Sequence, residues 1–265
     1  MNEYLNFAKQ IAQEAGRIML KYFNQDNGSS YKGDRTIVTL ADKEINSYLI
    51  EQVKIKYPDH SVDGEEEQSG KSTYVWVCDP VDGTAMYARH IPVAVFSLAL
   101  VIDGTPTVGV ILDPFTNNLY SAIKNEGAYM NDIRISVNDY QLDDIKTFCH
   151  CDMGSKTNYD ICEIFKTLRD KTNHKLNDIG SIARSGCLVA TGDYSVSIFM
   201  GEEHKNCDIA ALKVIVEESG GKVTDLFGNE QRYDQSIKGA IISNGKVHDD
   251  VIKLIEPILD KNNKC

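Results

Sequence analysis

The sequence predicts an α+β protein, because helical and strand patterns occupy different stretches of the 265-residue chain. Amphipathic helical patterns come first. Short apolar strands follow, and their turn signals indicate mainly antiparallel pairing. The pattern then changes at about residue 145. No internal repeat and no linker rich in Pro, Gly or Ser divides the chain. We therefore expect a single catalytic unit, residues 1–265, with subregions of about 1–145 and 146–265.

The N-terminal region shows helical periodicity. Apolar residues recur every three or four positions over residues 5–22, and a polar stretch beginning at Asn27 ends this segment. A second helix is expected from Leu40 to Lys56, because Pro58 cannot continue it. These segments predict two helices that cover one side of a core.

Strands dominate the middle of the chain. Asp103-Gly104 is typical of a hairpin turn between two apolar runs. Other runs are separated by Asn117-Asn118 and by Gly127, which also favour turns. The expected strands are Tyr74–Cys78, Val93–Ile102, Val108–Leu112, Leu119–Ile123 and Ala128–Met130.

The remainder of the chain mixes helices with a strand. Residues 207–219 form a strongly apolar helical pattern, which Gly220-Gly221 closes. Residues 188–191 are apolar, without a clear periodicity. The other expected elements are a helix over Asp160–Arg169, a strand over Ala240–Ser243 and a terminal helix over His248–Leu259.

The charge balance excludes some function classes. With 28 Lys and Arg against 39 Asp and Glu, the net charge is −11, which argues against direct binding of nucleic-acid phosphates. No apolar run approaches the roughly 18–20 residues of a membrane-spanning helix. We see no pattern of a signal peptide at the start, so we expect a cytoplasmic protein without a membrane partner.

The seven cysteines are scattered and fit reduced thiols better than a disulfide framework. Cys149-His150-Cys151 invites comparison with a zinc site. A structural zinc site needs about four ligands at loop spacings, and neither a CxxC nor an HxxxH pair lies nearby. We therefore interpret these thiols as incidental residues near a strand end.

The most informative stretch is Asp79-Pro80-Val81-Asp82-Gly83-Thr84, which follows an apolar run. Two carboxylates on one tight turn repel each other by several kcal/mol at low dielectric, and a divalent cation relieves that repulsion. The turn can also present the Val81 carbonyl to the cation and the Gly83 and Thr84 amides to a phosphate. Taken alone, the stretch is better interpreted as a surface Asp-Pro turn followed by an Asp-Gly bend.

Three further acidic features favour the metal interpretation. Asp63–Glu67 is an acidic segment upstream of the strand, Asp208 lies in the first turn of an apolar helix, and Asp42 lies at the start of another. Each has a structural explanation, as a solvated loop or a residue that stabilises a helix N-terminus. Together they supply spaced carboxylates around one strand–turn–helix.

The sequence resembles the inositol monophosphatase family, part of the lithium-sensitive, Mg²⁺-dependent phosphomonoesterases. The combination of Asp-Pro-x-Asp-Gly-Thr with an upstream Gly-Glu-Glu and a downstream Asp-x-Ala-Ala is specific, and the matches span about residues 38–221. The matching segments are Val38-Thr39 with Ala41-Asp42, Gly64-Glu65-Glu66, Asp79–Thr84, Val108-Gly109-Val110, Asp113-Pro114-Phe115, Glu126-Gly127-Ala128 with Asn131, Leu188–Gly192, Cys207–Ala211 and Gly220-Gly221.

The resemblance implies two or three Mg²⁺ ions per active site. It assigns the first ion to Glu65, Asp79 and the Val81 carbonyl, and the second to Asp79, Asp82 and Asp208, so that Asp79 bridges them. A third, weaker ion is supported by the Glu65 position, with Glu66 behind it. Two such ions can activate a water molecule and stabilise the leaving oxygen of an in-line displacement.

The resemblance also implies a reaction and a fold. Thr84 and Glu65 would orient the attacking water, and Asp42 would accept the proton of Thr84. The phosphate or substrate would contact Gly83, Thr84, Gly180 and Ser181. The implied product is free phosphate, released without a phosphoenzyme. The implied fold is a layered α-β-α-β-α sandwich of the sugar-phosphatase type, usually a homodimer and inhibited by Li⁺.

Several departures from the family pattern leave the substrate open. Cys207 stands where relatives usually have Trp, and Ile182 is bulky where Ala is typical. Ala85 follows the Asp-Gly-Thr turn at a position where many relatives have Thr, Ser, Lys or Arg. The segment before Cys207 is longer than usual, so either Glu202 or Glu203 could contact a sugar hydroxyl. Inositol 1-phosphate is our first expectation. Nucleotide 3′-phosphates such as 3′-phosphoadenosine 5′-phosphate, fructose 1,6-bisphosphate and histidinol phosphate are the alternatives.

Other interpretations of these motifs fit less well. Gly64–Ser72 imitates a nucleotide-binding P-loop, but its glycines are spaced by five residues rather than four, and its glutamates would repel a triphosphate. Asp79 and Asp82 do not have the Asp-x-Asp spacing of aspartyl-nucleophile phosphatases. A different class remains open, namely a regulator that binds transcription proteins.

Overall fold

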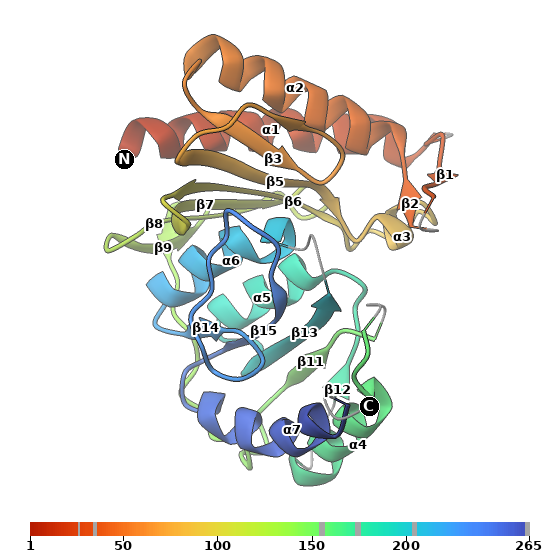
Figure 1. Ribbon diagram of the computed structural model, residues 1–265, viewed down its shortest axis with the longest axis vertical. Coiled ribbons are helices and arrows are strands. Elements are labelled where there is room, and N and C mark those ends of the chain that lie inside the picture. The colour runs from red at the N-terminus through yellow and green to blue at the C-terminus, as the bar shows by residue number, and fades with distance from the viewer. Residues whose placement is uncertain (26, 34–35, 154–156, 173–175, 203–205, 263–265) are drawn as a thin grey trace.

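Helices and sheets alternate in layers through the molecule (Figure 1). The computed structural model describes all residues except 26, 34–35, 154–156, 173–175, 203–205 and 263–265. In this part of the chain the layers confirm the expected α-β-α-β-α arrangement. In order, they hold α1 (Asn2–Phe23) with α2 (Leu40–Lys56), an eight-stranded sheet, α5 (Ile182–Ala190) with α6 (Asn206–Glu218), a five-stranded sheet, and α4 (Ile161–Thr172) with α7 (His248–Asn262).

The larger sheet is the antiparallel meander that the sequence predicts, extended by three short strands that it does not predict. The extension is β10 at one edge and β3 with β4 at the other, and β3 runs parallel to β5. The strand order is β10 (Ile133–Arg134), β9 (Gly127–Met130), β8 (Asn118–Ile123), β7 (Thr105–Asp113), β6 (Val95–Ile102), β5 (Tyr74–Asp82), β3 (Ser61–Gly64) and β4 (Gln68–Ser69). A separate hairpin pairs β1 (Ser30–Tyr31) with β2 (Ile37–Val38).

The smaller sheet comes from the second half of the chain and is mixed. Its strand β11 pairs in parallel with both neighbours, whereas β15 pairs antiparallel with both of its neighbours. Only β15 was predicted as a strand. The order is β12 (Leu176–Asn177), β11 (Cys149–Cys151), β13 (Val196–Glu202), β15 (Lys238–Ser243) and β14 (Lys222–Thr224).

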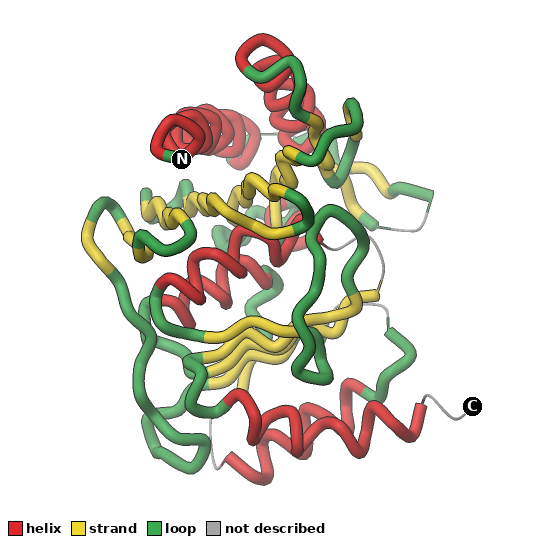
Figure 2. The backbone as a smooth tube through the Cα atoms, turned by 60° about the vertical axis from the view of Figure 1, so that its left-hand side comes forward, coloured by secondary structure: helices red, strands yellow, loops and turns green. Residues whose placement is uncertain are grey.

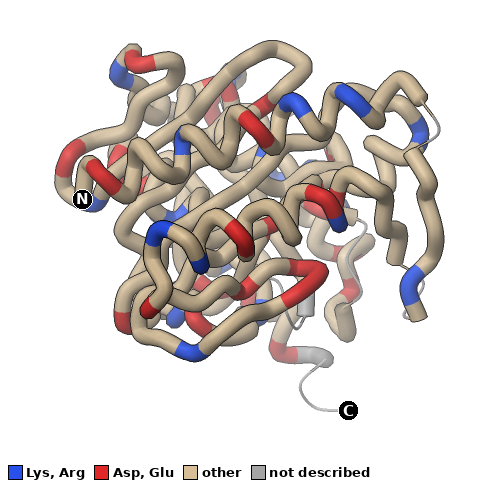
Figure 3. Tube along the Cα trace, turned by 90° about the horizontal axis from the view of Figure 1, so that it is seen from above, with Lys and Arg blue, Asp and Glu red and all other residues tan. Residues whose placement is uncertain are grey.

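Helix α6 is buried on nearly every side because it lies between the two sheets (Figure 2). Its backbone approaches β7 so closely that a Cβ atom on Gly109 would lie 2.6 Å from the carbonyl oxygen of Ala211. By contrast, α1 buries one face only. Acidic and basic residues lie along the outer sides of the first helical layer (Figure 3).

Two stretches that the sequence did not assign to an element belong to α5 and β11. Of the apolar residues 188–191, residues 188–190 form the end of α5. Cys149-His150-Cys151 makes up the whole of β11, so its two cysteines are the first and last residues of a strand. Successive side chains of a strand point to opposite faces, so its two thiols lie on one face and the imidazole on the other. Among the described residues these three side chains form no metal-ligating group.

His248 begins α7 as a fully buried imidazole between two hydroxyls. Its Nε2 lies 2.9 Å from the Thr224 hydroxyl and its Nδ1 lies 2.8 Å from the Ser243 hydroxyl. Burial, helped by the positive charge of Lys222, lowers the pKa of His248 to about 4. Between that pKa and the unfolded value of about 6.5, the unfolded chain binds more protons, so stability falls as the pH falls.

We predict that replacing His248 by Gln flattens the dependence of stability on pH. Between pH 7 and pH 5 the wild-type free energy of unfolding should fall by about 2 kcal/mol more than that of the variant. Urea unfolding at both pH values measures this difference. The control Ser243→Ala loses one hydrogen bond but keeps the imidazole, so it should retain the wild-type pH dependence. Parallel pH curves for His248→Gln and wild type would contradict the prediction.

Candidate active site

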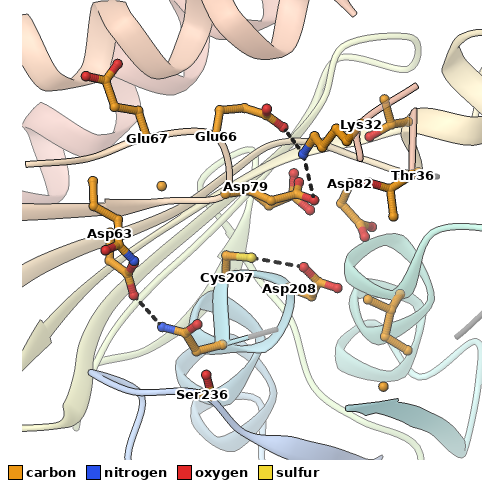
Figure 4. Close-up of a pocket in the computed structure, with 18 of the residues that line it drawn as sticks. Lys32, Thr36, Asp63, Glu66, Glu67, Asp79, Asp82, Cys207, Asp208 and Ser236 are labelled. Carbon is orange, nitrogen blue, oxygen red and sulfur yellow. Dashed lines mark hydrogen bonds and ion pairs between the residues drawn. The ribbon is translucent and has the colours of Figure 1, made fainter. Parts of the chain in front are cut away.

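A cleft of about 1510 Å³ lies where the end of β5 faces the N-termini of α5 and α6 (Figure 4). It collects side chains from segments far apart in the sequence. Asp42 and Val81, two further predicted residues, are fully buried behind its wall. The predicted residues that line the cleft are Glu65, Glu66, Asp79, Asp82, Gly83, Thr84, Gly180, Ser181 and Asp208.

The two acids of the central motif are presented by an irregular end of β5. The sequence predicts that the strand ends at Cys78, but its pairing with β6 resumes at Asp82 after a register shift. A bulge accommodates Pro80, which has no amide hydrogen to donate to the ladder. The Val81 amide donates to Oδ1 of Asp79 at 2.9 Å. The turn thus fixes the orientation of Asp79, which is only 2% exposed.

The carboxylate of Asp82 is oriented by the N-terminus of α5. Its Oδ2 accepts hydrogen bonds from the Ser181 hydroxyl and from the Ala183 amide, the latter at 2.9 Å. Gly83, with φ of +94°, brings the two segments close, because a Cβ atom there would lie 2.9 Å from the Gly180 carbonyl oxygen. The predicted substrate segment 180–181 therefore also positions Asp82.

Asp42 serves two neighbours at once. Its Oδ2 accepts hydrogen bonds from the amide of Thr39 at 2.8 Å and from its hydroxyl at 2.6 Å. The first of these bonds, together with the Asp42 amide directed at the Thr39 side chain, forms the capping box of α2. Its Oδ1 lies 3.5 Å from the Thr84 hydroxyl, which also donates to the Val81 carbonyl at 2.8 Å. Burial raises the pKa of Asp42 to about 7, although the Thr39 hydrogen bonds oppose this shift.

Asp208 enters the cleft from the first turn of α6. It is 4% exposed, and its Oδ1 accepts a hydrogen bond from the Cys207 thiol at 3.2 Å. One ligand atom from each of Asp79, Cys207 and Asp208 lies within 4.8 Å of the other two. The start of α6 is held by the side chain of Asn206, whose Nδ2 donates to the Asp63 carboxylate at 2.8 Å and to the Tyr233 carbonyl at 3.0 Å.

Lys32 is a cleft residue that the sequence did not single out. Its Nζ lies 2.5 Å from Oε1 of Glu66 and 3.6 Å from Oε1 of Glu65 (Figure 4). Burial works to lower the pKa of Lys32, but the charges of Glu65 and Glu66 outweigh it and raise the pKa above its usual value. In the sequence, Lys32 is simply a lysine in a polar loop, and no motif spacing connects it to Glu65 and Glu66.

The far wall of the cleft carries further acids that sequence reasoning missed. Asp152, Asp178 and Asp234 line it. Asp178 accepts hydrogen bonds from the Gly180 amide at 2.8 Å and from the Met153 amide at 3.1 Å. It therefore fixes the turn that leads to the contacts with Asp82. Its position follows from the parallel pairing of β11 with β12, which local patterns do not reveal.

The donor set fits a hard divalent cation. Asp79, Asp82 and Asp208 are buried acids that face one cleft, and Glu65 lies at its edge. Carboxylate and carbonyl oxygens are the ligands that Mg²⁺ prefers, and a concentration of buried negative charge attracts such an ion. The acidic cluster could therefore hold a metal ion at the floor of the cleft.

Comparison with known proteins identifies the group to which this molecule belongs. The model of the inositol monophosphatase family matches residues 1–259. This chain belongs to the inositol monophosphatase family. It is 29% identical to fructose-1,6-bisphosphatase/inositol-1-monophosphatase of Thermotoga maritima, with 97% of both chains covered. It is 30% identical to the Nus factor SuhB of Pasteurella multocida, covering 100% of this chain and 97% of the relative.

A solved structure supports the same assignment. An inositol monophosphatase from Thermotoga maritima superimposes with a TM-score of 0.86 and 26% identity, over 98% of this chain and 99% of that one. The family is a class of phosphomonoesterase hydrolases that depend on metal ions and act on small phosphorylated substrates. As an inositol monophosphatase family member, this chain is an enzyme of that class.

Two other family motifs have distinct outcomes. Asp113 of the Asp-Pro-Phe motif is buried away from the cleft, where its carboxylate accepts from the Arg184 guanidinium and from the Phe115 amide. It links the end of β7 to α5. The choice between Glu202 and Glu203 as the contact for a sugar hydroxyl lies outside the described residues, since these do not include Glu203 or the side chain of Glu202.

No described helix has the length and apolar character needed to span a bilayer.

We predict that Lys32→Met destabilises the metal-free protein, because Glu65 and Glu66 then lose their partly buried counter-ion. The expected loss is about 1–3 kcal/mol in the free energy of unfolding, measured by urea titration in a chelator. Added Mg²⁺ should reduce the loss if the ion takes over the neutralising role. The control Lys71→Met removes an exposed cation that lines the same cleft and should change stability by less than about 0.5 kcal/mol. Equal losses for both variants would refute the role of Lys32.

Proposed function

We propose that this enzyme is a Mg²⁺-dependent phosphomonoesterase that hydrolyses inositol 1-phosphate or a closely similar ester by direct attack of water. The observation that carries this proposal is the convergence of Glu65, Asp79, Asp82 and Asp208 on one cleft beside the Gly83-Thr84 turn. Buried acids at that density, next to a turn with amide donors, suit an anionic substrate only in combination with cations.

The residues proposed to hold the metal divide between two sets. Glu65, Asp79 and the Val81 carbonyl form one, and Asp79, Asp82 and Asp208 form the other. Bound Mg²⁺ would neutralise the acids, polarise the phosphate ester and lower the pKa of a water molecule. Glu66 lies beside Glu65 and shares Lys32 with it, which supports its proposed role behind the first set or near a third ion.

The proposed attacking water is oriented by Thr84 and Glu65. The Thr84 hydroxyl lies between the Val81 carbonyl and Asp42 and can turn its proton toward either acceptor. Asp42, with its pKa raised to about 7, is suited to hold or share a proton near neutral pH. Because water supplies the nucleophile, no covalent phosphoenzyme is needed.

The phosphate group is proposed to lie against the amides of Gly83 and Thr84. The backbone turns at Gly83, whose carbonyl accepts from Met86 and Tyr87 at 3.0 Å and so opens the helical turn α3 (Thr84–Tyr87). The remaining substrate atoms would lie toward Gly180 and Ser181 on the facing wall. That wall also carries Asp152 and Asp178, which can accept hydrogen bonds from the hydroxyl groups of a polyol.

Other features of the proposal follow the family rather than the cleft. We propose inhibition by Li⁺ at a magnesium position, a homodimeric assembly and a cytoplasmic location. The substrate alternatives are 3′-phosphoadenosine 5′-phosphate, fructose 1,6-bisphosphate and histidinol phosphate. One relative is named for both fructose 1,6-bisphosphate and inositol 1-phosphate, and another is named as a Nus factor, so a regulatory role beside hydrolysis is the second candidate function.

We predict that Asp82→Asn lowers Mg²⁺-dependent phosphate release from inositol 1-phosphate by at least about 10³-fold. The amide removes one negative charge from the proposed metal set without changing side-chain size. Release of free phosphate over a range of Mg²⁺ concentrations measures the effect. The control Asp132→Asn alters an exposed acid paired with Lys9 and should keep full activity. Wild-type turnover by folded Asp82→Asn protein would eliminate the proposed metal set.

A substrate panel separates the alternatives. Purified wild-type protein is supplied with each of the four esters in Mg²⁺, and kcat/KM is compared. Inositol 1-phosphate is expected to give the highest value, with loss of activity in millimolar Li⁺. A higher value for another ester would reassign the substrate while keeping the chemistry. No release from any ester would favour the regulatory role.

We predict that the hydroxyl of Thr84, rather than its methyl group, supports turnover. Thr84→Ala should lower kcat by about 10²–10⁴-fold, because the water then keeps only Glu65 of its two proposed orienting groups and loses the hydroxyl that links it to Asp42. Thr84→Ser keeps the hydroxyl and should stay within about tenfold of wild type. Steady-state kinetics at saturating Mg²⁺ checks both variants. Equal activities of the alanine and serine variants would show that the hydroxyl has no such role.

A further inference from the structure

Cys207 places a sulfur atom among the proposed magnesium ligands. The thiol is 3% exposed and donates to Oδ1 of Asp208 at 3.2 Å. Figure 4 shows it beneath Asp79, with its sulfur directed toward Asp208. Since its own carbonyl accepts from the Ser97 hydroxyl at 3.4 Å, the backbone that carries the sulfur is anchored to β6.

The distances suit a shared ion. One ligand atom from each of Asp79, Cys207 and Asp208 lies within 4.8 Å of the others. Two ligands about 2.0–2.3 Å from one tetrahedral zinc ion are separated by about 3.3–3.8 Å. Small side-chain rotations therefore suffice to bring all three atoms to one soft divalent cation. The cleft leaves room for water or another ligand to complete the coordination.

Sulfur and oxygen ligands select different metals. Mg²⁺ takes oxygen ligands, so toward that ion Cys207 acts as a neutral hydrogen-bond donor to Asp208. Zn²⁺ and Cd²⁺ bind thiolate strongly, and a bound ion of this kind displaces the thiol proton. Among the described residues, Cys207 is the cysteine that lines the cleft. It packs at the edge of the same hydrophobic core as Cys187, and Cys78 lies in the other core beside the cleft.

We propose that Asp79, Cys207 and Asp208 form a mixed thiolate–carboxylate site that binds Zn²⁺, Cd²⁺ or a similar thiophilic ion. Binding breaks the S–H bond of Cys207, forms a sulfur–metal bond and releases the proton to solvent, with no change of oxidation state. The ion excludes Mg²⁺ from the Asp79–Asp208 position. This exclusion, and the inhibition that follows, rest on the proposed function, whereas binding of the soft ion does not.

Cadmium binding tests the site without substrate. Wild-type protein is titrated with Cd²⁺ under reducing conditions, and the ultraviolet sulfur-to-cadmium charge-transfer band is recorded together with the heat of binding. We expect a band that saturates with one ion per chain and a proton released to the buffer. Cys207→Ser should lose the band and bind Cd²⁺ at least tenfold more weakly. Thermal unfolding in the absence of metal establishes that the variant is folded.

A second cysteine variant tests whether the cadmium charge-transfer band comes from Cys207. Cys162 is an exposed thiol on α4, remote from the cleft. Cys162→Ser should keep the wild-type band and affinity, so loss of the band in this variant would overturn the proposal. A band and affinity in Cys207→Ser equal to those of wild type would do the same.

Competition with magnesium connects the site to the cleft. A large excess of Mg²⁺ should lower the apparent Cd²⁺ affinity of wild type, and Asp208→Asn should weaken the binding of both ions. If Mg²⁺ supports phosphate release but wild type shows no cadmium band, the mixed site is wrong and the proposed function stands. If the band appears but no ester is hydrolysed, the proposed function fails and the mixed site stands.

Discussion

Mutual repulsion among buried carboxylates is the constraint around which this molecule is organised. Asp79, Asp82 and Asp208 are at most 5% exposed, yet they share one cleft. At low dielectric, like charges at such positions are strongly unfavourable unless protein donors or cations compensate them. The Val81 amide, the Ser181 hydroxyl and Ala183 amide, and the Cys207 thiol each donate to one of these acids. The fold therefore stabilises charge that local packing alone would reject.

These donors also explain why the cleft lies between the two sheets. The irregular end of β5 positions Asp79 and Asp82, and the start of α5 positions Ser181. Asp208 needs α6, which packs against both sheets and therefore cannot shift without disturbing either. Asp42, Asp79 and Asp82 each have at least one carboxylate oxygen held by a backbone amide, which fixes the orientation of the whole group. Rigid elements thus convert a distant set of acids into one site.

The sequence predicted the features that depend on local chemistry. Helical periodicity located α1 and α2, turn residues separated the strands of the meander, and the Asp79–Thr84 motif pointed to the cleft. The missed features depend on long-range pairing. The two-residue β12 and the strand β11 carry no useful periodicity, and Lys32 meets Glu66 only because the β1–β2 hairpin lies beside the segment after β3. The family resemblance, rather than spacing, assigned Asp42 to Thr84.

Lys32 and a divalent ion bound as proposed would act on the same acidic region, and this competition would link stability to activity. Lys32 is tethered beside Glu65 and Glu66, so it neutralises them at any ion concentration, but its four-carbon stem limits how deeply the charge can reach. A divalent ion carries twice the charge and binds only above a certain concentration. A tethered cation that was too effective would weaken metal binding, and its absence would leave the metal-free fold strained by its own acids. The position of Lys32 at the edge, nearer Glu66 than Glu65, would leave the innermost acids to the proposed diffusible ion.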